Sequence, residues 1–318
     1  MTEYGHSIRC RPREDPVKAN TLLLVGGDLC ARTAGALDPR AWTCAGLRRR
    51  AMDARPGARI RWLRADLGDP DALAGTLAAI PAPGDTASGD PEPAPAPITY
   101  ILYAPAPDAR TPQAYARAYP LGLRALLDAL PDPGRLRRCV LVDSSAVWGQ
   151  GPADRWVDED TPPAPADFRG AAMLEAEALL HARLPGRGVA LRLSGLYGPG
   201  RLRLTDGLRA GRSAAPDGPG HRAHRIHVDD AARACAHLLA LADPLPCYIG
   251  TDDHPMPTAD LYDALARMAG GPPPARESRP PDGKRLSNAR LRASGWTPAW
   301  PDMLDGYAAC LAAAAPPP

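Results

Sequence analysis

The chain has 318 residues, 45% of them hydrophobic, which is enough for a large buried core. Its 38 basic and 36 acidic residues leave a net charge of +2, and aromatic residues make up 5%. This balance argues against nucleic-acid and membrane partners, and we expect the partner to be a small-molecule substrate. The N-terminus has no signal-like apolar run and the seven cysteines form no C-x-x-C pair, so we expect a cytoplasmic protein with reduced thiols.

Strand-like and helix-like segments alternate along the first two thirds of the chain. Strands are expected within 21–25, 41–54 (with a helix start), 58–67, 98–107, 135–149 and 188–200, and helices within 69–80, 111–130 and 167–184. The alternation predicts an α/β fold with a Rossmann-like, doubly wound parallel sheet. Pro120 is expected to kink or divide its helix.

The alternation also suggests a division of the chain. Residues 1–20 are predicted to be a loose tail, and 21–200 a Rossmann-like dinucleotide-binding core. The Pro/Ala/Gly-rich segment 81–97 is predicted to be a flexible surface insertion in that core. Residues 201–318 are expected to form mainly a small C-terminal substrate lobe, with 227–250 packing back on the core.

The turn "VGGDLC" follows the first strand, where dinucleotide-binding folds carry G-x-G-x-x-G. The three motif positions fall on Val25, Gly27 and Cys30, so the central glycine alone is kept, with Gly26 beside it. Gly26 and Gly27 are predicted to approach a pyrophosphate at the helix N-terminus. Val25 disfavours a positive φ, and Cys30 is expected to push the helix away from the strand. Gly-Gly after a strand is also common in ordinary βα turns.

The end of the second strand has no acidic residue to bind ribose hydroxyls. Arg48 and Arg49 stand there instead, and arginines pair with a 2′-phosphate. This pattern favours NADP over NAD, with a solvated basic face and no cofactor as the alternative. Asp66 is predicted either to hydrogen-bond an adenine edge or to start the next helix.

Several motifs in the expected order resemble one superfamily over about 21–307. They include "ADLGDPDAL", "VDSSAVWG", "LEAEALL", "LRLSGLYGPGR" and "RIHVDD". The chain resembles the atypical and extended short-chain dehydrogenases/reductases, in the NAD-dependent epimerase/dehydratase group. The resemblance implies an NAD(P)-dependent oxidoreductase or epimerase-like enzyme, and a homodimer through the helices near 111–130 and 167–184.

The resemblance also assigns catalytic positions. The substrate-binding serine falls on Ser144, with Ser145 adjacent, whereas the positions of the catalytic tyrosine and lysine hold Arg169 and Met173. Arginine stays protonated and methionine has no acidic proton, so neither replaces the usual proton donor. We therefore expect a non-standard active site, in which Arg169 binds an anionic substrate group or lies on the surface.

Four further residues are considered as site residues. Tyr197 is a candidate substitute acid, and Arg225 a candidate substrate contact. Trp148 either stacks on a ligand or packs in the core, the latter being favoured. His227 is interpreted as a hydrogen-bonded structural residue. The other histidines show no metal-ligand spacing, and no metal site is expected.

Three classes of function remain open from the sequence. The first is an NADP-linked reductase, dehydrogenase or epimerase-like enzyme with an altered proton donor. The second is a non-redox cyclase, isomerase or lyase that reuses the same site. The third is a catalytically silent sensor that binds NADP(H). Fold alone does not choose among them, and we rank the first slightly ahead.

Overall fold

The computed structural model describes residues 20–49, 58–80, 97–149, 155–217, 220–279 and 283–314. The predicted tail at 1–20, except for its last residue, lies outside the described residues. The same holds for the predicted insertion at 81–97, of which residue 97 alone is described.

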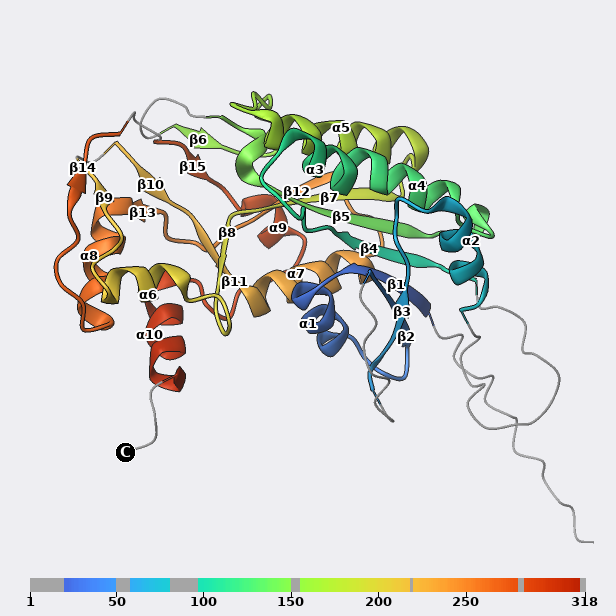
Figure 1. Ribbon diagram of the computed structural model, residues 1–318, viewed down its shortest axis with the longest axis horizontal. Helices are drawn as coiled ribbons and strands as arrows, with labels where there is room; N and C mark the ends of the chain where they lie inside the picture. Colours follow the sequence, from blue (N-terminus) through green and yellow to red (C-terminus); the bar gives the residue numbers. More distant parts are fainter. Residues whose placement is uncertain are drawn as a thin grey trace, which may run out of the picture.

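A seven-stranded parallel sheet forms the centre of the molecule, in the order β12-β7-β5-β4-β1-β2-β3 (Figure 1). Its strands are β1 (Asn20–Gly26), β2 (Trp42–Arg48), β3 (Ile60–Arg64), β4 (Tyr100–Ala104), β5 (Arg138–Ser144), β7 (Gly188–Leu193) and β12 (Cys247–Gly250). The predicted Rossmann-like, doubly wound α/β fold is confirmed.

The inner strands are apolar because helices cover them on both faces. Leu22, Leu23 and Leu24 of β1 are all fully buried, although successive side chains point to opposite sides of the sheet. The strand order reverses between β1 and β4, which makes this point of the carboxyl edge the switch point where ligands bind in such sheets.

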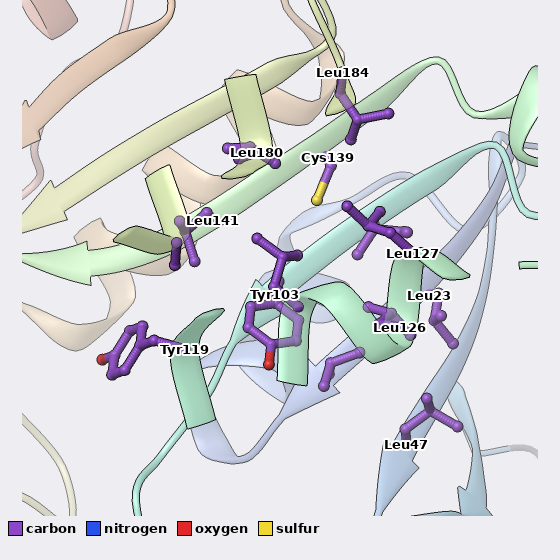
Figure 2. Packing of buried hydrophobic residues seen from close by; sticks show 14 of the residues in the cluster. Leu23, Leu47, Tyr103, Tyr119, Leu126, Leu127, Cys139, Leu141, Leu180 and Leu184 are labelled. Atoms are coloured by element: carbon purple, nitrogen blue, oxygen red, sulfur yellow. The ribbon is translucent and has the colours of Figure 1, made fainter. Parts of the chain in front are cut away.

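Two layers of helices enclose the sheet. On one face lie α1 (Asp28–Ala36) and α7 (Val228–Ala240), which pack together. The other face carries α2 (Pro70–Ala78), α3 (Pro112–Ala116), η1 (Arg117–Leu121), α4 (Gly122–Asp128) and α5 (Phe168–Arg183). Figure 2 shows leucines of α4 and the α5 region meeting Tyr103 and Leu141 of the strands, so each face has its own apolar core.

The segment α3–η1–α4 is one helix with a widened, π-helical turn at Arg117–Leu121. Pro120 lies inside that turn and has no N–H to donate to the preceding turn. The expected interruption at Pro120 therefore takes the form of a change in helical pitch rather than a break.

The C-terminal part of the described chain adds a smaller lobe beside the carboxyl edge (Figure 1). Its own apolar cluster includes Tyr197, Leu261 and Tyr307. The helices of this part are α6 (Arg203–Arg209), α8 (Thr258–Met268), α9 (Ala289–Ala293) and α10 (Met303–Ala314). Its short strands are β8 (Gly195–Tyr197), β9 (Ala215–Pro216), β10 (Arg222–Ala223), β11 (Arg225–His227), β13 (Met256–Pro257), β14 (Arg276–Glu277) and β15 (Arg285–Leu286), the last paired with β6 (Trp156–Val157).

All six cysteines in the described ranges are buried and unpaired. Burial raises the pKa of the Cys44 thiol to about 11 and of the Cys139 and Cys235 thiols to about 12. None of the helices in the described ranges has both the length and the apolar character needed to cross a lipid bilayer.

Candidate active site at the carboxyl edge

The turn after β1 depends on Gly26. Its φ is +147°, and a Cβ at this position would lie 2.3 Å from the carbonyl oxygen of Ala104, at the end of β4. A side chain is therefore excluded by both conformation and contact. The predicted difficulty at Val25 does not arise, because Val25 stays in the strand and the positive φ falls on Gly26.

Cys30 does not hold α1 away from the sheet, which corrects the expectation from the sequence. It is fully buried in the same apolar cluster as Leu22 and Leu24 of β1. Its Sγ lies 3.0 Å from the position that a Cβ of Gly26 would occupy. The space needed by the sulfur is thus provided by the missing side chain of Gly26.

The N-terminus of α1 is open. Gly27 is the N-cap residue, no side chain caps the helix, and nothing lies within 4 Å of a Cβ built on Gly27. The carboxylate of Asp28 is neutralised by Arg32 at 3.0 Å and Arg201 at 3.4 Å. The unpaired N–H groups of the first turn and the open glycine fit the pyrophosphate of a dinucleotide.

The arginines at the end of β2 both contact other side chains. Arg49 forms a two-pronged ion pair with Asp108, which follows β4. The guanidinium carbon of Arg48 lies 3.9 Å from the ring centroid of Trp62. Asp66 accepts the N–H of Gly68 at 2.9 Å and so shapes the turn before α2. A 2′-phosphate on Arg49 would have to displace Asp108.

Ser144 and Ser145 are half-buried at the end of β5. The Oγ of Ser144 accepts the N–H of Ala146 at 3.2 Å and caps the short 3₁₀ turn η3 (Ser145–Val147). Helix α5 begins directly against this turn, because a Cβ on Gly170 would lie 2.3 Å from the carbonyl oxygen of Ala146. The start of α5 and the two serines therefore form one surface.

The positions of the missing tyrosine and lysine have their own contacts. Arg169 donates from Nε to Asp167 at 2.8 Å, while Asp167 also caps α5 by accepting the N–H of Arg169. The Arg169 hydrogen bond keeps the pKa of Asp167 below its usual value. Met173 is buried in the apolar core. Arg169 stays protonated and Met173 has no ionisable proton, so neither can act as a general acid or base.

Three ionisable residues lie buried beneath this surface, and the sequence did not reveal them as a group. Arg192 of β7 forms two hydrogen bonds with Glu177 of α5, at 2.8 and 2.7 Å, and Asp143 of β5 is the register partner of Arg192. Burial and the Glu177 charge raise the pKa of Asp143 well above its usual range. Burial opposes ionisation of Glu177 too, but Arg192 outweighs it and lowers the pKa of Glu177.

A group of aromatic rings was also missed. Tyr115 stacks on Tyr119 with ring centroids 5.9 Å apart, and Tyr115 meets Phe168 edge-on at 5.5 Å. The two tyrosines come from α3 and η1, and Phe168 begins α5. The spacing of four residues between the tyrosines was a usable signal, because it places them on one helix face.

Known proteins share this fold over nearly the whole chain. A protein of Methylobacillus flagellatus assigned as an NAD-dependent epimerase/dehydratase is 35% identical, covering 93% of this chain and 98% of its own, with a TM-score of 0.72. A conserved protein of unknown function from Silicibacter pomeroyi is 28% identical, covering 93% and 99%, with a TM-score of 0.69. The Thermus thermophilus UDP-glucose 4-epimerase in complex with NAD is 21% identical, covering 92% and 98%, with a TM-score of 0.71, and shows the fold alone.

The chain belongs to the NAD-dependent epimerase/dehydratase group of the short-chain dehydrogenase/reductase superfamily. Among curated proteins, Protein YeeZ of Escherichia coli is 35% identical over 142 residues, which is 44% of this chain. The match spans about half of YeeZ, at 49% of its length. No protein-family model matches the chain.

Two residues predicted to contact a substrate in this epimerase/dehydratase fold have packing roles. Trp148 is buried, donates its indole N–H to the carbonyl of Thr161 at 2.9 Å and lies under the guanidinium of Arg192 at 4.6 Å. This agrees with its favoured interpretation as a core residue. Arg225 covers Gly195, donates to the carbonyl of His224 at 3.1 Å and contacts the hydroxyl of Tyr307.

Tyr197, the candidate substitute acid, belongs to the apolar cluster of the C-terminal part of the chain, together with Tyr307. It is fully buried, stacked on Tyr307 at 4.2 Å and edge-on to His227 at 5.2 Å. Burial, with the charge of Asp252, raises the pKa of its phenol. His227 caps α7 by accepting the N–H of Asp229 at 3.2 Å. Within the six described ranges, no cluster of His, Cys, Asp or Glu is arranged to hold a metal ion.

Proposed function

We propose that the chain is an NAD(P)-dependent oxidoreductase or epimerase-like enzyme that acts on a small molecule with a carbonyl or alcohol group. The observation that carries the proposal is the open N-terminus of α1, at the switch point between β1 and β4 and next to the Gly26–Gly27 turn. Membership of a group named for NAD dependence supports it.

The chain's own residues would hold the parts of such a cofactor. The turn at Gly26 and Gly27, with the first N–H groups of α1, would bind the pyrophosphate. Arg49 would bind a 2′-phosphate after exchanging Asp108 for it, which favours NADP over NAD. When bound, the nicotinamide supplies a hydride donor or acceptor. Ser144 would then hold a substrate oxygen by a hydrogen bond at the end of β5.

Calorimetric titration of the purified chain with NADPH, NADP, NADH and NAD tests the proposal. We expect binding of all four, with NADPH and NADP the tighter. Arg49→Ala should remove the preference, whereas Arg64→Ala at the end of β3 serves as a matched control that should keep it. No binding of any dinucleotide would contradict the proposed function, and equal affinities would contradict the assignment of Arg49 alone.

A second candidate is a protein that binds a dinucleotide without redox turnover, as a sensor or a non-redox enzyme. It is favoured by the Arg169–Asp167 pair and by the buried Met173, because neither Arg169 nor Met173 can act as a general acid. Tight binding combined with no oxidation or reduction of the cofactor across a panel of carbonyl and alcohol compounds would favour this candidate over the first.

A further inference from the structure

The π-helical turn η1 is built into the structure by specific contacts. Pro120 lacks the N–H that a regular helix needs, and the hydroxyl of Tyr103 on β4 donates to the carbonyl of Ala118 at 2.6 Å. A Cβ on Gly122 would lie 2.5 Å from that hydroxyl, so Gly122 leaves room for it. π-helical turns inside α-helices occur frequently at functional sites.

The widened turn presents Tyr119. Its side chain is 5% exposed, and its ring is held on one side by the stacked ring of Tyr115. Figure 2 shows the ring of Tyr119 at the end of the apolar cluster toward which β5 runs, with the hydroxyl turned away from the leucine side chains. The phenol thus lies toward the carboxyl edge of the sheet, where Ser144 also lies.

Neighbouring residues link Tyr119 to α5 and to β5. Tyr115 links it to Phe168 at the start of α5, and the same part of α5 rests on the turn that follows Ser144. From β5, Asp143 is close enough to act electrostatically on Tyr119, and burial is the main cause that raises the pKa of the Tyr119 phenol. The hydroxyl therefore keeps its proton at neutral pH, and a protonated phenol can donate a hydrogen bond.

We propose that Tyr119 supplies, from η1, the phenol hydroxyl that the epimerase/dehydratase group places at the position of Arg169. Tyr119 and Ser144 would donate hydrogen bonds to the same carbonyl or alcohol oxygen of the substrate. This inference rests on the proposed function.

NMR of protein labelled with ¹³C at the Cζ of tyrosine tests the inference without requiring turnover. The Tyr119→Phe variant assigns one signal and Tyr115→Phe, from the same stacked pair, assigns its neighbour. The probes are UDP-glucose, a panel of simple aldehydes and a panel of ketones, each with and without saturating NADP. We expect at least one probe to shift the Tyr119 signal and leave the Tyr115 signal in place. An unchanged Tyr119 signal with every probe overturns the inference.

Kinetics give the second measurement, on the probe reduced fastest by NADPH. Tyr119→Phe should lower kcat by roughly 10²–10³, the usual effect of losing a donor to developing charge, with the dinucleotide Kd unchanged. Tyr115→Phe should stay within about threefold of the wild type, which lies inside the range of most surface changes. Equal losses in both variants overturn the inference. If the wild-type protein binds no dinucleotide, that result contradicts the proposed function rather than this inference.

Discussion

The units β1–α1 and β5–α5 both pass from a strand into a helix at the carboxyl edge, but their turns are held differently. The first is held by apolar packing and by Gly26, and its helix begins without a side-chain cap. The second unit buries Asp143, Glu177 and a strand arginine, and Asp167 caps its helix.

This difference affects how well the N-terminus of each helix can bind an anion. An anion is attracted to a helix N-terminus whose N–H groups are free, as in α1. The first turn of α5 already has its own carboxylate in that place. The β1–α1 unit is thus suited to binding a phosphate, whereas in the β5–α5 unit Arg169 pairs with Asp167 and Met173 is buried in the core.

The largest effect is expected from removing a buried charge of the second unit. Glu177→Ala would leave Arg192 buried without its partner and should lower the free energy of unfolding by roughly 3–5 kcal/mol. Asp128→Ala breaks the half-exposed pair with Arg183, at 2.7 Å, and should cost less than about 1 kcal/mol. Urea unfolding of both variants measures the contrast. Similar losses would mean that the buried pair does not organise β5–α5.

The two glycines of the first unit should separate stability from binding. Gly26→Ala forces a side chain into the Ala104 carbonyl at a positive φ, and should cost roughly 2–3 kcal/mol of unfolding free energy. Gly27→Ala meets no atom and should fold with a loss of about 1 kcal/mol or less, yet bind NADPH about tenfold more weakly. Thermal unfolding and calorimetry distinguish them, and an unchanged NADPH affinity in Gly27→Ala would remove this turn from the binding site.

Titration of Asp143 should make the second unit sensitive to pH. Its pKa is raised on folding, so the native chain holds a proton that the unfolded chain loses above the ordinary aspartate range. Stability is therefore complete below that range and falls as the pH rises toward the native pKa, by at most about 1.4 kcal/mol per unit. Asp143→Asn should flatten this fall in urea midpoints measured across pH. A fall of equal slope in the variant would assign it to other groups.

The smallest effect concerns the specificity of the first unit. Asp108→Asn removes the ion pair that occupies Arg49 and should tighten NADPH binding by about threefold, the scale of an exposed pair. NADH, which lacks the 2′-phosphate, should bind as before. A parallel gain for both dinucleotides would show that Asp108 acts on the whole site rather than on the 2′-phosphate.

The sheet was predictable because the alternating apolar runs extend over many residues, and each local signal agreed with its neighbours. The buried group that contains Asp143 and Arg192 was not predictable, because these two residues stand in different strands and become partners only through the register of the sheet. The position of Tyr119 was predictable only in part. Its spacing from Tyr115 indicates a shared helix face, but the hydrogen bond from Tyr103 to the π-helical turn links residues from different elements. The effect of Cys30 on helix packing was predicted wrongly, because the space for its sulfur is set by the backbone conformation of Gly26.

The buried cysteines can report how each secondary-structure element opens locally. Five of the six buried cysteines lie in five different elements: Cys30 in α1, Cys139 in β5, Cys235 in α7, Cys247 in β12 and Cys310 in α10. Their thiols are shielded and their pKa values raised, so an alkylating reagent reacts with each one when its own element opens. The order in which these five thiols are alkylated would give the order in which their elements open. No cysteine has to be introduced by mutation for this measurement.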